Sequence, residues 1–194
     1  MNAQLCVRRL GPADLRRYRP RFLDLYREVY SEPPYSETEE HVAAYAERFV
    51  EESARSGFAV VVAESGTELA GYAYGHSFAA DDWWQDADQE PAETKGCTKF
   101  AVMELAVRRP CRGRGVGTRL MGALIDGRPE QLATLCSNPA APARQIYHRW
   151  GWQPVAVAHP PNIPPMEILV LWLPEAPTNV ESDPRAADAA HAGS

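Results

Sequence analysis

The chain has 194 residues, which is enough for one sizeable domain and short for two. Its hydrophobic fraction of 45% and charged fraction of 24% exclude a disordered, collagen-like or coiled-coil protein. The formal net charge of −6 argues against extensive nucleic-acid contacts, which usually need a basic surplus. We therefore expect no nucleic-acid partner. No apolar run approaches the roughly 20 residues of a membrane span, so a membrane is not expected as a partner either.

The cysteines and histidines show no metal-binding spacing, and no C-x-x-C pair occurs. We therefore expect reduced thiols, no metal site and a cytoplasmic location. The four cysteines are Cys6, Cys97, Cys111 and Cys136.

The N-terminal segments predict a strand followed by helices. Residues 4–10 alternate between apolar and polar side chains and predict the strand. Pro12 suits a first helical turn, and Pro20 is expected to divide the helical stretch that follows. Ser36-x-x-Glu39 reads as a capping box for a second helix, which ends at Gly57.

The remaining segments alternate between strands and helices. A hairpin turn at Ser65-Gly66-Thr67 joins two strands, and a long loop at 79–98 precedes the most apolar strand. The predicted strands are 58–64, 68–77, 98–107, 131–136, 153–159 and 166–173, and the later helices are 118–126 and 142–150.

This order of elements predicts a mixed α/β sheet rather than a doubly wound one. An antiparallel meander is followed by one β–α–β crossover, so most strand pairs should be antiparallel. We expect one domain at 1–173. In 174–194, Val180 is the only large apolar residue, which predicts a disordered tail.

The most informative segment is MELAVRRPCRGRGVGT at 103–118, in which a strand enters a glycine-rich turn and then a helix. Backbone N–H groups at such a helix start bind phosphate, and glycine lets the ligand approach closely. No lysine follows the glycines, which excludes a P-loop, and Thr118 stands where the dinucleotide fingerprint has its third glycine. The arginines around the turn are Arg108, Arg109, Arg112, Arg114 and Arg119.

Arg112-x-x-Gly115-x-Gly117 resembles the pyrophosphate loop [RQ]-x-x-G-x-[GA] of the GNAT superfamily of acetyl-CoA-dependent N-acetyltransferases. The preceding ELAV at 104–107 resembles the strand that leads into that loop. ARQIYHRWGW at 143–152 resembles the family segment A-x-x-x-Y-x-x-x-G-[FW]. The resemblance covers about 58–173. It implies a GNAT-like, mostly antiparallel sheet with splayed central strands and flanking helices, and acetyl-CoA as cosubstrate.

The resemblance also implies where acetyl-CoA binds, between the strands at 98–107 and 131–136. The family often has an asparagine seven residues before its tyrosine, but Ala140 stands there, so Asn138 is the remaining candidate for a pantetheine contact. Backbone groups at the end of the first strand would hold the pantetheine and polarise the acetyl carbonyl: Leu105, Ala106 and Val107. Amides of the turn would hold the pyrophosphate: Arg112, Gly113, Arg114, Gly115, Val116, Gly117 and Thr118.

Tyr147 matches the family tyrosine that protonates the departing thiolate as a general acid. The alternative is a tyrosine that only packs in the core. In the family the amine attacks the thioester directly, so Cys111 or Cys136 as an acyl carrier is a lesser alternative.

Glu104 is the predicted general base, because it is the only carboxylate on the central strand. Many relatives place the base nine or eleven residues before the loop's first arginine, here Met103 and Ala101. In a regular strand Glu104, eight residues before that arginine, points to the opposite face from Met103, unless a bulge reverses it. His76 is another candidate for the base, and a purely structural carboxylate is the alternative for Glu104.

The expected acceptor is the primary amine of a small cationic molecule, with an aminoglycoside-like compound or amino-antibiotic favoured. Residues 81–93 hold six acids and no basic residue, so Asp82, Trp83 and Trp84 are predicted to bind the cation. Tyr35 in the YSEPPY segment is a further acceptor candidate. The acidic segment is alternatively a solvated loop.

Two other functions remain as alternatives: a protein or peptide N-acetyltransferase, and a non-catalytic acyl-CoA-sensing domain. The sequence leaves a homodimer open.

Overall fold

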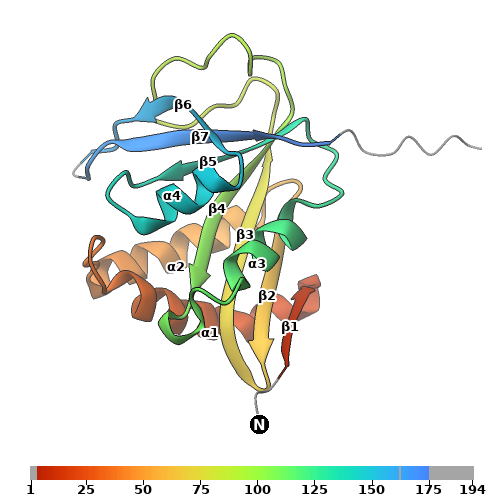
Figure 1. The fold of residues 1–194 in the computed structure, drawn as a ribbon, viewed down its shortest axis with the longest axis vertical. Helices are drawn as coiled ribbons and strands as arrows, with labels where there is room; N and C mark the ends of the chain where they lie inside the picture. The colour runs from red at the N-terminus through yellow and green to blue at the C-terminus, as the bar shows by residue number, and fades with distance from the viewer. Residues whose placement is uncertain (1–3, 162, 175–194) are drawn as a thin grey trace, which may run out of the picture.

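The computed structural model describes residues 4–161 and 163–174, and most of the predicted tail at 174–194 lies outside these ranges. Seven strands form one sheet in the order β1-β2-β3-β4-β5-β7-β6 (Figure 1). The strands are β1 (Leu5–Arg9), β2 (Ala59–Ser65), β3 (Glu68–Phe78), β4 (Lys99–Val107), β5 (Leu132–Ser137), β6 (Gln153–Ala158) and β7 (Met166–Trp172). The helices are α1 (Pro12–Tyr30), α2 (Glu39–Ser53), the short 3-10 helix η1 (Arg109–Cys111), α3 (Val116–Ile125) and α4 (Pro142–Arg149).

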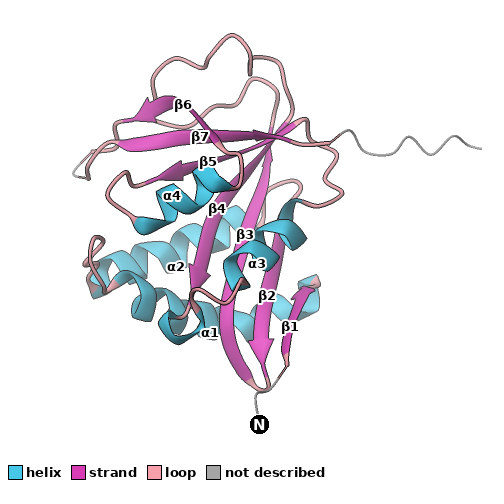
Figure 2. Cartoon of the chain, viewed as in Figure 1, coloured by secondary structure: helices cyan, strands magenta, loops and turns pink. Residues whose placement is uncertain are grey.

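The central pair of strands determines where a ligand can enter. β4 and β5 are parallel, whereas the other neighbouring strands in the sheet are antiparallel. They pair only from Lys99–Ala101 to Leu132–Thr134, and beyond this short ladder β4 diverges from β5 (Figure 2). This confirms the predicted mixed sheet with splayed central strands.

The two faces of the sheet are covered by different helices. Figure 1 shows α1 and α2 on one face and α3 and α4 on the other. One apolar cluster joins α1 and α2 to β2 and β3, with Phe22, Tyr45 and Tyr72 among its fully buried members. The other cluster lies under α3 and includes Leu120 and the α4 residue Tyr147. Burial on both faces fixes the direction of each strand's side chains.

Two local predictions for the N-terminal helices are wrong. Pro20 does not divide the first helix, because buried side chains on both sides of it, Tyr18 and Phe22, pack into the same cluster. This packing offsets the loss of one helical N–H donor. The second helix is capped by Thr38 rather than by Ser36, and the Thr38 N–H donates to Nδ1 of His41 at 3.2 Å.

The loop at 79–98 is anchored beside β5 and β6. The Lys99 ammonium is fully buried, and it binds a Glu90 carboxylate oxygen at 2.9 Å and the Ala80 carbonyl at 2.9 Å. The Asp88 N–H donates to the Val157 carbonyl of β6 at 2.8 Å. These bonds fix the loop at the N-terminal end of β4, where β4 pairs with β5 and away from the splayed end.

Candidate active site

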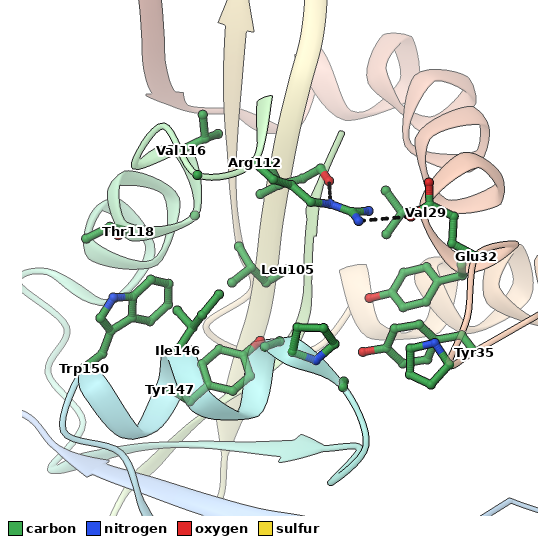
Figure 3. A pocket seen from close by; sticks show the side chains of 18 of the residues that line it. Val29, Glu32, Tyr35, Leu105, Arg112, Val116, Thr118, Ile146, Tyr147 and Trp150 are labelled. Atoms are coloured by element: carbon green, nitrogen blue, oxygen red, sulfur yellow. Dashed lines mark hydrogen bonds and ion pairs between the residues drawn. The ribbon is translucent and has the colours of Figure 1, made fainter. Parts of the chain in front are cut away.

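A cavity of about 390 Å³ lies beside the splayed end of β4 (Figure 3). The glycine-rich turn and the start of α3 form one wall, α4 forms another, and the connection between α1 and α2 forms the third. The predicted site residues that line it are Tyr35, Leu105, Val107, Arg112, Gly113, Gly115, Val116, Gly117, Thr118 and Tyr147. The chain thus brings its two sequence motifs together on one cavity.

The glycine-rich turn has the backbone of an anion site. Gly113 and Gly115 have φ angles of +72° and +75°, and Gly115 is the N-cap residue of α3. A Cβ at either position would meet no atom within 4 Å, so backbone conformation rather than space makes glycine the suitable residue. The first N–H groups of α3 have no partner within the helix and carry its positive dipole end. This arrangement fits a pyrophosphate.

Carboxylates of α1 and of the segment after it hold the arginines of the turn. Arg108 lies 3.4 Å from a Glu28 carboxylate oxygen. Glu32 lies 3.6 Å from Arg109 and 3.0 Å from Arg112, and it lines the cavity together with Arg112 (Figure 3). Periodicity did not indicate this pairing, because 80 residues separate Glu32 from Arg112. Three of the five arginines around the turn, Arg108, Arg109 and Arg112, are therefore less free for phosphate than the sequence indicated.

A bulge in β4 sets the direction of Glu104. The register with β3 shifts so that Tyr74 faces Glu104 and Gly75 faces Val102, which leaves Met103 as the additional residue. Before the bulge, Val102 packs into the cluster under α3. After it, the Glu104 carboxylate lies on the opposite face, toward α1. This is the reversal that its predicted role as base requires.

The surroundings of Glu104 favour a carboxyl that changes protonation near neutral pH. Its side chain is 6% exposed, and it accepts hydrogen bonds from the Tyr30 hydroxyl and, at 3.2 Å, from the Leu105 N–H. Burial raises the pKa of Glu104 to about 7, although the Tyr30 bond and the positive charge of Arg48 act in the opposite direction. Glu104 itself does not line the cavity, but both of its hydrogen-bond donors, Tyr30 and Leu105, do, so the carboxylate lies directly behind the cavity wall.

Tyr147 approaches the same cavity from α4. Its side chain is 9% exposed and packs edge-on to Trp150, with ring centroids 5.9 Å apart. Burial raises the pKa of Tyr147, and the proximity of Tyr35 and Glu104 adds to the effect. Figure 3 shows the hydroxyls of Tyr35 and Tyr147 pointing toward one another across the cavity. The Tyr147 hydroxyl therefore stays protonated at neutral pH and can act as a proton donor.

Three residues predicted to contact the cofactor do not line the cavity. Ala106 is fully buried in the cluster under α1 and α2, and Arg114 is exposed at the turn. The Asn138 Oδ1 accepts the Ala140 N–H at 2.9 Å, so this side chain stabilises the turn before α4.

The structure also does not bring the acidic loop to the cavity. Asp82 accepts the Ala79 N–H at 3.0 Å, and the Trp83 indole donates to a backbone carbonyl in the same loop. The Trp84 indole donates to the Thr134 hydroxyl of β5 at 2.9 Å. None of these loop residues lines the cavity, because the anchored loop lies against β5 and β6.

The alternative nucleophiles and base lie outside the cavity lining. Burial raises the pKa of the Cys136 thiol to about 12, which leaves it protonated and weakly nucleophilic. Cys111 packs at the edge of the cluster under α3. His76 is 2% exposed on β3, and burial lowers its pKa.

Sequence reasoning missed Tyr30, Glu32 and Arg149 as residues of the site. Tyr30 has no predicted role in the site, yet its hydroxyl donates a hydrogen bond to Glu104. The signal for Tyr30 and Glu32 was present in the aromatic and acidic composition of YSEPPY at 30–35. Arg149 lies within the second motif but had no assigned role.

Comparison with known proteins agrees with this geometry. The family model described as "Acetyltransferase (GNAT) family" matches residues 20–152, which is more than half of the chain. The chain belongs to the GNAT acetyltransferase family. It is an acetyl-CoA-dependent acetyltransferase, and the predicted resemblance to the GNAT superfamily is confirmed. No curated protein sequence matched the chain.

Solved structures share the fold of this GNAT protein at low identity. PH1933 from Pyrococcus horikoshii OT3 has a TM-score of 0.62 at 18% identity, covering 88% of this chain and 99% of that one. Arabidopsis thaliana NAA60 with a bisubstrate analogue has a TM-score of 0.60 at 17% identity, covering 87% and 98%. The PaiA N-acetyltransferase from Thermoplasma acidophilum with coenzyme A has a TM-score of 0.60 at 13% identity, covering 88% and 99%.

Two further observations concern only the described ranges, 4–161 and 163–174. None of their helices is long and apolar enough to cross a membrane. No group of three His, Cys, Asp or Glu side chains among them is arranged to hold a metal ion.

Proposed function

We propose that this GNAT protein transfers the acetyl group of acetyl-CoA to a primary amine by direct attack, with Glu104 as base and Tyr147 as acid. The observation that carries the proposal is the buried Glu104 carboxylate beside the cavity, with a pKa of about 7. A carboxylate with this pKa accepts a proton from an ammonium near neutral pH, directly or through a water molecule. Tyr147, which is protonated and lines the cavity, donates a proton to the departing thiolate.

We assign acetyl-CoA, which supplies the thioester, to this cavity. In this assignment the amides of the turn from Arg112 to Thr118 hold the pyrophosphate, at the start of α3. Leu105 and Val107 border the pantetheine path. Glu104, behind the cavity wall, and Tyr147, in that wall, would then serve separately for proton removal from the amine and proton delivery to sulfur.

The favoured acceptor is the primary amine of a small cationic molecule that also contacts aromatic and proline rings. The connection between α1 and α2 supplies this wall through Tyr30, Tyr35, Pro33 and Pro34. Tyrosine faces and the adjacent Glu104 carboxylate favour a cation. An aminoglycoside-like acceptor loses its main support, because the acidic loop at 81–93 does not border the cavity.

A protein or peptide N-terminal amine is the second candidate. A long loop such as 79–98 could obstruct an extended groove, but its bonds to β5 and β6 hold it away from the cavity. A peptide acceptor would extend away from the α1–α2 connection without meeting that loop.

The experiment is a thiol-release assay with acetyl-CoA and a panel of small amines, aminoglycosides and short peptides. We expect one class of small amine to accelerate release, and mass spectrometry to find a product heavier by one acetyl group. The Glu104→Gln variant should lose this activity. Glu52→Gln is the matched control, because Glu52 is also buried, has a raised pKa and accepts a tyrosine hydroxyl, but its partner Tyr74, unlike Tyr30, does not line the cavity. Coenzyme A binding without acceleration by any acceptor would contradict the enzymatic proposal and favour an acyl-CoA sensor.

A further inference from the structure

Three of the residues that line the cavity carry a charge, and one of them has no assigned role. They are Glu32, Arg112 and Arg149. Glu32 and Arg112 form an ion pair at 3.0 Å, and Arg112 also donates to the carbonyl at the end of β4. Arg149 is exposed, and no acidic side chain in the described part of the chain pairs with it. The unpaired charge of the cavity is therefore positive and lies on α4.

Arg149, in the last turn of α4, lines the same cavity as the glycine-rich turn where the phosphates of the cofactor are expected. Ile146, Arg149 and Trp150 line the cavity at spacings of three and four residues, so they share one face of the helix. A Cβ on Gly117 would lie 3.6 Å from the Trp150 ring, which shows that this face of α4 packs against the start of α3. Arg149 thus borders the turn from a different side than Arg112.

Coenzyme A carries two kinds of anionic group, the central pyrophosphate and the 3′-phosphate of its adenosine. The backbone amides at the start of α3 suit the pyrophosphate. An exposed arginine at the rim of the same cavity suits a phosphate that remains partly solvated, because its guanidinium can move to form two parallel hydrogen bonds.

We propose that Arg149 binds the adenosine 3′-phosphate of the acetyl donor and makes the enzyme discriminate coenzyme A from 3′-dephospho-coenzyme A. This inference rests on the proposed acetyl-CoA site and adds the residue that selects the phosphorylated donor. Arg149 acts on donor binding and has no part in the proton transfers of Glu104 and Tyr147.

A purely structural role is the competing explanation. Arg149 stands in the last turn of α4, where a cation stabilises the negative end of the helix dipole. Loss of that role would lower the melting temperature and weaken both ligands equally. Loss of a 3′-phosphate contact would weaken only the ligand that carries this phosphate.

Isothermal titration calorimetry with coenzyme A and with 3′-dephospho-coenzyme A separates these roles. We expect the wild-type protein to bind coenzyme A about fivefold more tightly, as suits one exposed guanidinium–phosphate pair. In Arg149→Gln the ratio should fall to about one, through weaker binding of coenzyme A alone. Arg149→Lys should retain part of the ratio, and raised salt should reduce the wild-type ratio.

Arg16→Gln is the control, because it removes one exposed positive charge from α1, outside the cavity lining. Its ratio should equal that of the wild type. An unchanged ratio in Arg149→Gln, or an equal loss of affinity for both ligands, would overturn the inference. If the wild type bound neither ligand, the acetyl-CoA site itself would be refuted, which is a distinct result.

Discussion

Replacement of Glu104 by glutamine tests the proposed base through stability as well as through rate. Glutamine keeps an oxygen that accepts the hydrogen bonds from Tyr30 and Leu105, but it cannot ionise. The wild-type carboxyl has its pKa raised from 4.5 to about 7 by burial. The folded protein therefore binds more protons than the unfolded chain between these pH values. Its stability must decline as pH rises from about 4.5 through 7.

The size of this effect follows from the two pKa values. Between pH 5 and pH 8 the wild type should lose about 2.5 kcal/mol of unfolding free energy through this one group. Glu104→Gln lacks this loss, so its melting temperature relative to wild type should rise by roughly 5–10 °C over the same range. Thermal melts of the wild type and the variant at pH 5 and pH 8 measure the difference.

The rate of the same variant gives the second half of the test. In the wild type, kcat/KM for the amine should fall as the pH is lowered, and this acidic limb of the pH–rate profile should have its midpoint near pH 7, because the protonated carboxyl cannot accept a proton. Glu104→Gln should lose roughly 100-fold or more in kcat at pH 8 and should lack that limb. Retention of an unaltered limb in the variant would refute Glu104 as the base. A pH-independent difference in melting temperature would refute its raised pKa.

The other predictions concern the acid and the phosphate turn. Tyr147→Phe should lower kcat on the order of 100-fold with little change in the Kd of acetyl-CoA, because only proton delivery to sulfur is lost; an unchanged kcat would remove Tyr147 from the mechanism. Glu32→Gln should tighten acetyl-CoA binding severalfold in calorimetry at low salt, since it removes a carboxylate from the cavity and frees Arg112; weaker binding would contradict this. Gly115→Ala should cost about 1 kcal/mol in thermal unfolding and weaken acetyl-CoA, because φ there is +75°. Gly122→Ala, inside α3 with open space around it, should be neutral or stabilising.

The parts of this molecule that the sequence could predict depend on short-range patterns. Apolar periodicity placed the strands and helices to within a few residues, and the glycine spacing located the turn before α3. The continuity of α1 through Pro20 was not predictable in this way, because it depends on packing against the sheet. The position of the loop at 79–98 depends on the buried Lys99–Glu90 pair, whereas its acidic composition predicted a cation-binding segment or, alternatively, a solvated loop.

The bulge at Met103 is a feature that the sequence could not predict and on which the proposed role of Glu104 as base depends. Counting residues along a regular strand placed Glu104 on the wrong face for a base, and no local signal in the sequence marks the additional residue. The register of β4 against β3 creates the bulge, so that register decides which side of the sheet receives the carboxylate. A regular strand that kept Met103 in the ladder would instead put Glu104 on the face of Val102, toward α3 and away from Tyr30. The catalytic assignment of Glu104 thus depends on strand pairing as much as on the presence of a glutamate at this position.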